Sequence, residues 1–399
     1  MITKDYIKLD EKYSAHNYHP LDIVLAKGKG IWVYDVAGKK YMDFLSSYSA
    51  LNQGHRHPRI IAAAKKQLDK LTLTSRAFRN DQMGLFCKEI CTLTGFETFL
   101  PMNSGAEGVE TALKIARKFA NKKRKIKDGE IIVCKNNFHG RTITIISFSS
   151  EEQYKDGFGP LTPGFKIVSY NDIDAIAKAI TKKTIGVLIE PIQGEAGILI
   201  PNDGYLTKVA KLCRDKGILF LLDEIQTGLG RTGKMFAYEH EKNAKPDLLI
   251  VGKALGGGVY PISGVLTSKE IMSVITPGDH GSTFGGNPFA TAVARAALQV
   301  LVEEKLVQNS DKLGKYLVQK LKTIKSKWIK EVRGKGLFIG IELVPASGGA
   351  RRFCEELARQ GVLCKETHEM VIRLAPPLII TKKEIDQAFS IIKKVLEVA

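Results

Sequence analysis

The sequence lacks long hydrophobic stretches. None of its apolar runs approaches the roughly eighteen residues that a membrane-spanning helix needs. Residues 1–20 have neither the apolar core of a secretory signal nor the acid-poor, arginine-rich composition of a transit peptide. No internal repeat or low-complexity segment is present. We therefore expect a globular, cytoplasmic protein without membrane association, and the length of 399 residues favours two closely packed domains.

The sequence also lacks the cysteine patterns of a disulfide framework or a structural metal site. Its cysteines form no CxxC pair and have no metal-type spacing to histidine. His55 and His57 precede Pro58 without a third ligand nearby, so we interpret this segment as the start of a helix. We expect no metal ion and reduced thiols throughout. The cysteines are Cys87, Cys91, Cys134, Cys213, Cys354 and Cys364.

Aromatic residues are not interleaved with the basic ones, although the formal net charge is +18. Such an interleaved pattern is typical of surfaces that bind single-stranded nucleic acid. The one dense basic run, residues 121–129, lies between a helical pattern and a strand, and we predict a solvated loop there. Nucleic-acid binding is therefore the least favoured function, and we expect no nucleic-acid partner.

Short β-rich runs alternate with helical patterns in the middle of the chain. The apolar runs are continuous, which is typical of strands covered on both faces in a mostly parallel sheet. A helix is predicted at 204–217, with Gly217 as its stop. The pattern indicates an α/β doubly wound core. The predicted strands are 131–134, 142–147, 166–169, 185–190, 218–223, 248–252 and 262–266.

After about residue 290 the pattern becomes that of a separate, smaller α+β domain. Residues 28–44 read as two short strands around an Ala-Gly turn, and we expect them to pack against this C-terminal part. The expected division is 1–48 as a segment of the small domain, 49–290 as the large domain and 291–399 as the remainder of the small domain. The predicted C-terminal elements are helices at 288–304, 309–325, 349–360 and 382–397 and a strand at 336–343.

Three ionisable residues stand at the carboxyl ends of predicted strands: Glu190, Asp223 and Lys253. Taken alone, each is more typical of a solvated strand end. In open parallel sheets, however, ligands bind beyond the carboxyl ends of the strands, so we expect these side chains to share one crevice. Lys253 also precedes three glycines, in LLIVGKALGGGV, and glycine permits close approach by another group. A desolvated lysine beside a carboxylate favours Schiff-base chemistry, because desolvation favours the neutral, nucleophilic amine.

A phosphate-binding helix start is predicted within residues 101–120. Ser104 and Glu107 have capping-box spacing, and Gly105 lets backbone N–H groups approach a ligand at the positive end of the helix. Such caps are common, so this signal is weak alone. Residues 280–287 (HGSTFGGN) add hydroxyl groups. A phosphate clamp, a reactive lysine and a carboxylate for a ring nitrogen together match pyridoxal phosphate (PLP), which has a phosphate, an aldehyde and a pyridine nitrogen.

Two long motifs carry a family resemblance. Residues 220–239 (FLLDEIQTGLGRTGKMFAYE) and 246–258 (PDLLIVGKALGGG) resemble the signature of the class III, fold type I, PLP-dependent aminotransferases. The resemblance extends from about Tyr18 to the last predicted helix. It implies an α/β fold with a large PLP-binding domain, in which helices sandwich a mostly parallel seven-stranded sheet, and a smaller α+β domain built from both termini.

The resemblance implies roles for matching residues. Lys253 would form the Schiff base with PLP and then move a proton between substrate and cofactor. Asp223 would pair with the protonated ring nitrogen. Gln226 would reach the phenolic oxygen of the cofactor, and Phe138, in NNFHGRT, would stack on the ring.

The resemblance also implies a homodimer with shared active sites. The backbone of Gly105 and Ala106 would hold the PLP phosphate from one chain. Thr283, with Ser282 beside it, would reach the same phosphate from the neighbouring subunit.

Within the family, the chain is most similar to the members that act on ornithine. The strongest indication is residues 43–58 (DFLSSYSALNQGHRHP), which place Tyr48 where relatives acting on acetylornithine or 4-aminobutyrate generally lack a tyrosine. Arg141 would bind the ornithine carboxylate in a bidentate pair. Tyr18 would contact the α-amine, and Tyr48 would shape the pocket so that the δ-amine reaches the cofactor.

A second arginine, Arg373, would attract the α-carboxylate and misorient ornithine unless it were masked. Glu195, in IQGEAG, is placed to pair with Arg373 and would move aside when 2-oxoglutarate binds. The implied reaction converts L-ornithine and 2-oxoglutarate into L-glutamate and L-glutamate 5-semialdehyde, which cyclises to pyrroline-5-carboxylate.

Two other functions stay open. The first is an aminotransferase of acetylornithine or 4-aminobutyrate, because His139 and Phe284 stand where some ornithine-specific members have Trp and Tyr. The second is a PLP-binding protein without turnover. The intact set of Lys253, Asp223 and Arg141 argues against this second alternative.

Overall fold

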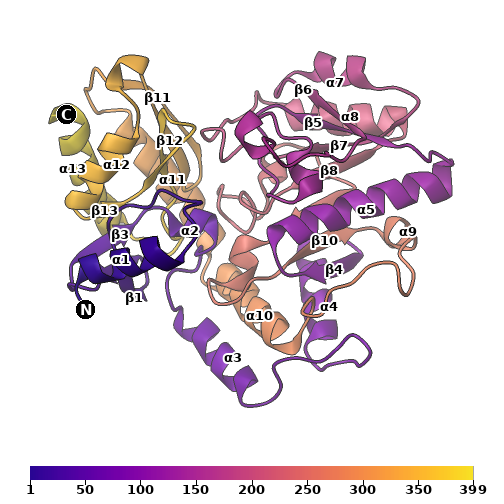
Figure 1. Cartoon of the computed structure of the whole chain (residues 1–399), viewed down its shortest axis with the longest axis horizontal. Helices are drawn as coiled ribbons and strands as arrows, with labels where there is room; N and C mark the ends of the chain where they lie inside the picture. Colours follow the sequence, from indigo (N-terminus) through magenta and orange to yellow (C-terminus); the bar gives the residue numbers. More distant parts are fainter. Residues whose placement is uncertain (399) are drawn as a thin grey trace.

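The computed structural model describes residues 1–398. Two parts lie next to each other in Figure 1. One part, on the right, is built on a seven-stranded sheet. The other, on the left, combines the indigo N-terminal strands with the orange and yellow C-terminal elements. Both ends of the chain lie in this second part.

The seven-stranded sheet has the order β4-β10-β9-β8-β7-β5-β6. Only β10 runs antiparallel to its neighbours, β9 and β4, and the other pairs are parallel. The predicted mostly parallel sheet is therefore confirmed. Its strands are β4 (Thr98–Met102), β5 (Glu130–Cys134), β6 (Phe165–Val168), β7 (Thr184–Ile189), β8 (Leu219–Asp223), β9 (Leu248–Val251) and β10 (Ser263–Thr267).

The continuous apolar strands are covered on both faces, as their sequence pattern indicates. Alternate residues of β5 enter two different hydrophobic clusters: Ile131 and Val133 pack into one, and Ile132 and Cys134 into the other. All four side chains are buried. Because the parallel strands run in the same direction, their carboxyl ends lie at one edge of the sheet. The ionisable residues at these strand ends therefore lie at that edge.

Two strand assignments made from sequence differ from the structure. The predicted strand 142–147 is wrong: Ile143–Ile146 form the short helix α6, and the Thr142 side chain accepts a hydrogen bond from the Ile145 N–H at 3.3 Å. Strand β4, not predicted, takes the edge of the sheet instead. It contains Pro101, a residue that cannot donate to a strand ladder and is confined to edges and ends.

Helix α5 (Gly105–Arg124) begins with the capping box that its sequence predicts. The Ser104 hydroxyl accepts the Glu107 N–H, and the Glu107 carboxylate accepts the Ser104 N–H. The basic run 121–129 is only partly a loop, because α5 continues through Arg124. Lys122, Lys123 and Arg124 lie in its last turn, where positive charge interacts favourably with the helix dipole.

The smaller part contains two four-stranded sheets, β1-β2-β3-β13 and β11-β12-β15-β14. Strand β3 pairs in parallel with β13, with Met42 opposite Val362, so N-terminal and C-terminal strands share one sheet. The predicted helix at 309–325 begins and ends earlier, at Leu306–Leu321. The strands are β1 (Leu25–Lys29), β2 (Trp32–Asp35), β3 (Lys40–Asp43), β11 (Ile329–Lys335), β12 (Phe338–Leu343), β13 (Val362–Leu363), β14 (Lys365–Thr367) and β15 (Val371–Leu374).

Helices complete both parts. The remaining α-helices of the described chain are α1 (Thr3–Tyr13), α2 (Ser46–Ser49), α3 (Pro58–Leu68), α4 (Met83–Thr94), α7 (Ile173–Ala179), α8 (Tyr205–Lys216), α9 (Lys269–Met272), α10 (Pro288–Glu303), α11 (Leu306–Leu321), α12 (Arg351–Arg359) and α13 (Lys382–Val398). Gly217 ends α8 in the left-handed conformation, as predicted.

The glycine run after Lys253 is explained by close packing. A Cβ atom on Gly257 would lie 2.9 Å from Ile60 Cδ1, and one on Gly258 would lie 2.1 Å from Leu51 Cδ2. Both glycines also have positive φ, 56° and 69°. Only glycine meets both conditions without strain. Residues that follow Tyr48 therefore pack directly on the segment that carries Lys253.

Within residues 1–398, all six cysteines are free thiols. The same residues contain no group of side chains able to hold a metal ion. No helix of this described part is long and apolar enough to cross a membrane.

Arg231 joins distant parts of the fold from a fully buried position. Its guanidinium donates to the backbone oxygens of Leu337 (2.9 Å) and Pro376 (2.6 Å) and to Asn52 Oδ1 (2.5 Å). Burial lowers the pKa of Arg231 to about 9, and the nearby Asp43 charge opposes that shift. The Arg231 guanidinium is thus a shared hydrogen-bond donor for three segments that lie far apart in the sequence.

Replacing Arg231 with methionine should therefore destabilise the protein. The three acceptors would lose their donor in the interior, and each unsatisfied buried group costs roughly 1–3 kcal/mol, so we expect the free energy of unfolding to fall by at least about 3 kcal/mol. Thermal unfolding followed by calorimetry measures the change. The matched control is Arg59→Met, because Arg59 pairs with Glu303 on the surface and such pairs contribute about 0–1 kcal/mol. Equal unfolding midpoints for the two variants would contradict the role of Arg231.

Candidate active site

The ends of three parallel strands place Glu190, Asp223 and Lys253 around one cavity of about 210 Å³, which we call the Lys253 cavity. Glu190 follows β7, Asp223 ends β8, and Lys253 follows β9 after one glycine. The sequence prediction that these residues share a crevice is confirmed. The other lining residues are Gly105, Ala106, Phe138, His139, Gly140, Glu195, Ile225, Gln226 and Thr227.

Lys253 stands in a strained position with an unusual charge environment. Its backbone φ is +44°, a left-handed value that is uncommon for residues other than glycine. Burial lowers the pKa of Lys253, and the carboxylates of Glu195 and Asp223 oppose this shift. The amine is thus closer to its neutral, nucleophilic form than that of a surface lysine.

Asp223 is held by a buried histidine. Its Oδ2 lies 2.7 Å from His139 Nδ1, and its Oδ1 accepts the Ile225 N–H at 3.0 Å. Burial disfavours the charged imidazole, but the hydrogen bond and charge of Asp223 outweigh this and raise the pKa of His139. Sequence reasoning gave His139 no role. Its position directly after Phe138 in NNFHGRT was the available signal.

The Glu190 carboxylate connects two loops of the cavity wall through hydrogen bonds. It accepts the Phe138 N–H at 2.9 Å and the Gly194 N–H at 3.4 Å. Burial raises the pKa of Glu190 to about 7. Glu190 therefore fixes two loops at the cavity wall, one carrying Phe138 and the other leading to Glu195.

The residues around the Lys253 cavity fit PLP. His139 Nε2 and Gln226 Oε1 are buried without a hydrogen-bond partner among the described residues. Buried polar atoms are normally hydrogen-bonded, so these two fit a site whose ligand supplies their partners. Gly105 and Ala106 open α5, and the first N–H groups of a helix have no partner inside the helix. A phosphate is favoured at such a helix start.

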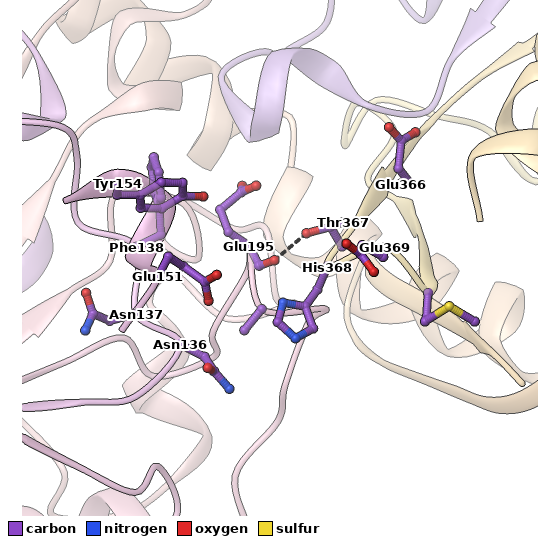
Figure 2. A pocket seen from close by; sticks show the side chains of 12 residues that line it. Asn136, Asn137, Phe138, Glu151, Tyr154, Glu195, Glu366, Thr367, His368 and Glu369 are labelled. Atoms are coloured by element: carbon purple, nitrogen blue, oxygen red, sulfur yellow. Dashed lines mark hydrogen bonds between the residues drawn. The ribbon is translucent and has the colours of Figure 1, made fainter. Parts of the chain in front are cut away.

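A second cavity, of about 560 Å³, lies between the two parts of the molecule; we call it the cleft cavity. Figure 2 shows Phe138, Glu151 and Tyr154 on one side and Glu366, Thr367, His368 and Glu369 on the other. Phe138 and Glu195 line both this cavity and the Lys253 cavity. The cleft cavity therefore adjoins the lysine site.

Glu195 and Arg373 form an ion pair at the boundary between the parts. Arg373 Nη1 donates to Glu195 Oε1 at 2.5 Å, and Gln226 Nε2 donates to the same oxygen at 3.1 Å. Burial alone would raise the pKa of Glu195, but the Arg373 charge and hydrogen bond hold it below its usual value. Arg373 is only 1% exposed, whereas the Glu195 side chain is 29% exposed. Glu195 is thus the more exposed and less tightly enclosed member of the ion pair.

Arg141, the other arginine with a predicted role in substrate binding, makes no hydrogen bond with the Glu195–Arg373 pair. The Arg141 guanidinium carbon lies 3.7 Å from the centroid of the Tyr154 ring and 5.6 Å from that of Phe138. Arg141 is exposed and makes no ion pair among the described residues. Its charge is therefore available on the Phe138 side of the cleft.

Tyr18 and Tyr48 share a third cavity of about 590 Å³, the Tyr48 cavity, which meets the cleft cavity at Glu366. The Arg373 guanidinium carbon lies 4.9 Å from the centre of the Tyr48 ring. Burial raises the pKa of Tyr48. Tyr18 is 74% exposed and does not line the Lys253 cavity.

Ser282 and Thr283 do not line the Lys253 cavity within this chain. The Ser282 hydroxyl accepts a hydrogen bond from Asn103 Nδ2 at 2.7 Å, which ties its loop to the residue before Ser104. Thr283 is exposed. A contact between Thr283 and a PLP phosphate therefore stays a prediction about an assembled dimer.

The fold and the lysine-centred site are those of a transferase that uses PLP. A family model described as aminotransferase class-III matches residues 13–396, and the chain belongs to this family. The chain is 58% identical to the ornithine aminotransferase of Brevibacillus brevis over 398 residues, which cover 99% of each protein.

Solved structures support the same assignment. The ornithine aminotransferase of Toxoplasma gondii, with partial occupancy of PLP at its active site, superposes with a TM-score of 0.97 at 43% identity and covers 99% of this chain and 94% of its own. The acetylornithine aminotransferase of Elizabethkingia anophelis superposes with a TM-score of 0.90 at 46% identity and covers 99% of both chains.

Gly194 sets the position of Gln226, and this suggests a sharp test of the cavity. A Cβ atom on residue 194 would lie 1.8 Å from Gln226 Oε1 and 3.1 Å from Phe338 Cζ. In Gly194→Ala, Gln226 must move, and it would then lose the hydrogen bond to the phenolic oxygen of PLP that the family resemblance implies. A hydrogen bond to a charged group contributes about 1.5–3 kcal/mol, so we expect PLP affinity to fall about tenfold or more.

Absorbance titration with PLP measures this affinity. Gly84→Ala is the control, because Gly84 lies in α4 with nothing within 4 Å of the added carbon. Wild-type affinity in Gly194→Ala would rule out the proposed contact between Gln226 and the cofactor.

Proposed function

We propose that this protein is an ornithine δ-aminotransferase, which converts L-ornithine and 2-oxoglutarate into L-glutamate 5-semialdehyde and L-glutamate. The semialdehyde then cyclises to pyrroline-5-carboxylate. The proposal rests on the Glu195–Arg373 ion pair beside Lys253, because a masked arginine suits an enzyme that must accept an α-amino acid by its distal amine. The ornithine aminotransferase of Brevibacillus brevis supports it through its 58% identity over nearly the full length.

PLP would be held by residues that line the Lys253 cavity. Gly105 and Ala106 would bind its phosphate, Phe138 would stack on its ring, and Gln226 would reach its phenolic oxygen. Asp223 would pair with its ring nitrogen. When bound, PLP supplies an aldehyde that reacts with amines and a ring that takes up the electrons released by proton removal.

Lys253 would bond to the cofactor and then act as the proton carrier. Its Nζ, kept closer to neutral by burial, would accept a proton from the reacting substrate carbon and deliver it to the cofactor. Asp223 would hold a proton at the ring nitrogen of bound PLP, and His139 fixes the orientation of the Asp223 carboxylate through their 2.7 Å contact. His139 is thereby a positioning residue for Asp223.

Ornithine would be oriented by its α-amino acid end. Arg141, exposed on the Phe138 side of the cleft, would bind the carboxylate in a bidentate pair. Tyr18 would contact the α-amine, and Tyr48 would direct the δ-amine toward Lys253. The masked Arg373 would offer no second carboxylate site while Glu195 stays bound to it.

2-Oxoglutarate would reverse that masking. Its two carboxylates would need both arginines, with the α-carboxylate on Arg373 and the distal one on Arg141. Glu195, the more exposed member of the pair, would move aside. Removing one partner of a buried ion pair costs about 3–5 kcal/mol, so the incoming carboxylate must replace Glu195 on Arg373.

An acetylornithine aminotransferase is the second candidate function. It is favoured by the 46% identity to the Elizabethkingia anophelis enzyme, and His139 and Phe284 do not distinguish the two substrates. A tyrosine at position 48 favours ornithine. PLP binding without turnover is disfavoured by the arrangement of Lys253 beside Asp223 and Glu195.

We also propose the assembly and setting of the enzyme. A homodimer would let Thr283 and Ser282 of one chain reach the PLP phosphate of the next; both lie on a loop with the exposed Phe284. We propose domain limits of 49–290 for the large PLP-binding domain, with 1–48 and 291–399 forming the small one. The pairing of β3 with β13 supports this division. A cytoplasmic protein without a nucleic-acid partner fits these proposals.

Lys253→Ala tests the reaction. Proton transfer by a positioned side chain contributes about 10²–10⁴-fold, so ornithine-dependent glutamate formation should fall at least about a hundredfold. Lys269→Ala is the control, because Lys269 also stands two residues beyond a strand but is exposed. The absorbance of bound PLP is followed on addition of ornithine, acetylornithine or 4-aminobutyrate. An undiminished rate in Lys253→Ala would refute the mechanism, and a preference of the wild type for acetylornithine would refute the substrate.

Glu195→Ala tests the masking of Arg373. Without the carboxylate, Arg373 is free to bind α-carboxylates, and a charge-assisted hydrogen bond of about 1.5–3 kcal/mol corresponds to roughly tenfold or more in preference. We expect kcat/KM for the α-amine of L-glutamate to rise relative to that for ornithine by this factor. Glu369→Ala removes another carboxylate from the same cleft cavity and should leave the ratio unchanged. Identical ratios in the two variants would count against masking.

A further inference from the structure

Tyr48 sits on a strained turn. Ser46, Ser47, Tyr48 and Ser49 have φ values of 51°, 47°, 60° and 70°, so four consecutive residues other than glycine are left-handed. Left-handed backbone costs an L-residue roughly 1–2 kcal/mol. Such strain persists only where the surroundings fix the backbone, and it concentrates at functional sites.

The turn is held at its N-terminal side by Asp43, the last residue of β3. Asp43 Oδ1 accepts the N–H groups of Leu45 (2.9 Å) and Ser46 (2.8 Å). β3 is itself paired on both sides, with β2 and β13, so the carboxylate has a fixed position. These two bonds fix the backbone at the start of the left-handed turn.

His55 fixes the other carboxylate oxygen. Its Nε2 lies 2.7 Å from Asp43 Oδ2. The backbone of His55 exchanges two hydrogen bonds with Gly30, at 2.8 and 2.9 Å. A Cβ atom on Gly28 would lie 2.9 Å from the imidazole, so the ring packs tightly against β1. Neither member of the Asp43–His55 pair therefore has freedom to shift.

The turn is held at its C-terminal side by the segment that carries Lys253. Leu51 packs against Gly258, and the Gln53 side chain donates to the Ala254 backbone oxygen at 3.2 Å. Tyr48 thus projects from a turn fixed between the small sheet and the lysine segment. Its ring lies 4.9 Å from the Arg373 guanidinium carbon.

We propose that Asp43 and His55 are positioning residues for substrate specificity: they hold the Tyr48 turn so that the tyrosine faces the Glu195–Arg373 pair. This inference rests on the proposed function and deepens it. If the turn relaxes to right-handed backbone, Tyr48 leaves its place, and the site no longer distinguishes the distal amine of a diamino acid from an α-amine. The effect falls on substrate orientation and leaves the proton transfer at Lys253 intact.

The test uses the PLP-loaded enzyme and the variant Asp43→Ala. We expect kcat/KM for L-ornithine to fall at least tenfold, mainly through KM, while kcat/KM for the L-glutamate half-reaction changes less than about threefold. Asp43→Asn should restore most of the ornithine activity, because an amide oxygen still accepts the two N–H groups. This rescue distinguishes positioning from charge.

Asp35→Ala is the matched control. Asp35 ends β2 in the same sheet and accepts the N–H groups of Ala37 and Lys39, so it stabilises a turn in the same way at a distance from Tyr48. It should leave the ornithine-to-glutamate ratio unchanged. An unchanged ratio in Asp43→Ala, or an equal shift in Asp35→Ala, would overturn the proposal.

His55→Leu keeps the proposal testable if Asp43→Ala does not fold. It removes one partner of Asp43 and leaves the two turn bonds, so we expect a smaller change of the ratio in the same direction. No change in a folded His55→Leu would overturn the role of His55. A wild-type enzyme that does not transaminate ornithine would refute the proposed function itself, which is a separate outcome from an unchanged ratio in an ornithine-active enzyme.

Discussion

The site depends on keeping one amine out of bulk water among carboxylates. Lys253 stands at the end of a buried strand, and burial favours its neutral form while Glu195 and Asp223 oppose that effect. The glycines after it let Leu51 and Ile60 cover the segment closely. Close packing of this segment therefore explains both the lowered pKa of Lys253 and the glycines that follow it.

The two halves of the site come from the two parts of the molecule. Asp223 ends a strand of the large sheet and Lys253 follows another, whereas Arg373 lies on β15 of a small sheet. Glu195 joins them, because it contacts Arg373 and also lines the Lys253 cavity. This ion pair is therefore one of the polar contacts that join the two parts, together with the bond from the Thr367 hydroxyl to the Glu195 backbone oxygen.

The sequence predicts the strand ends well and the details between them less well. Continuous apolar runs, such as the one that ends at Asp223, predict the large sheet. Parallel strands are buried on both faces, so nearly all their side chains are apolar. The run 142–147 is rich in β-branched residues but forms a helix, since Thr142 caps it and tertiary packing overrides propensity. The His139–Asp223 contact joins residues far apart in the chain, and local patterns do not reveal it. The turn at Tyr48 contains no glycine or asparagine, the residues that adopt positive φ most readily, so the sequence did not indicate its left-handed backbone.

The pairing of β3 with β13 has a consequence for synthesis on the ribosome. The N-terminal hairpin has an open edge until Val362 has been made, because that residue pairs with Met42. An unpaired strand edge is a template for pairing with other chains. Residues through Val362 must therefore be synthesised before this edge is closed, and the open edge can pair with other chains throughout that time.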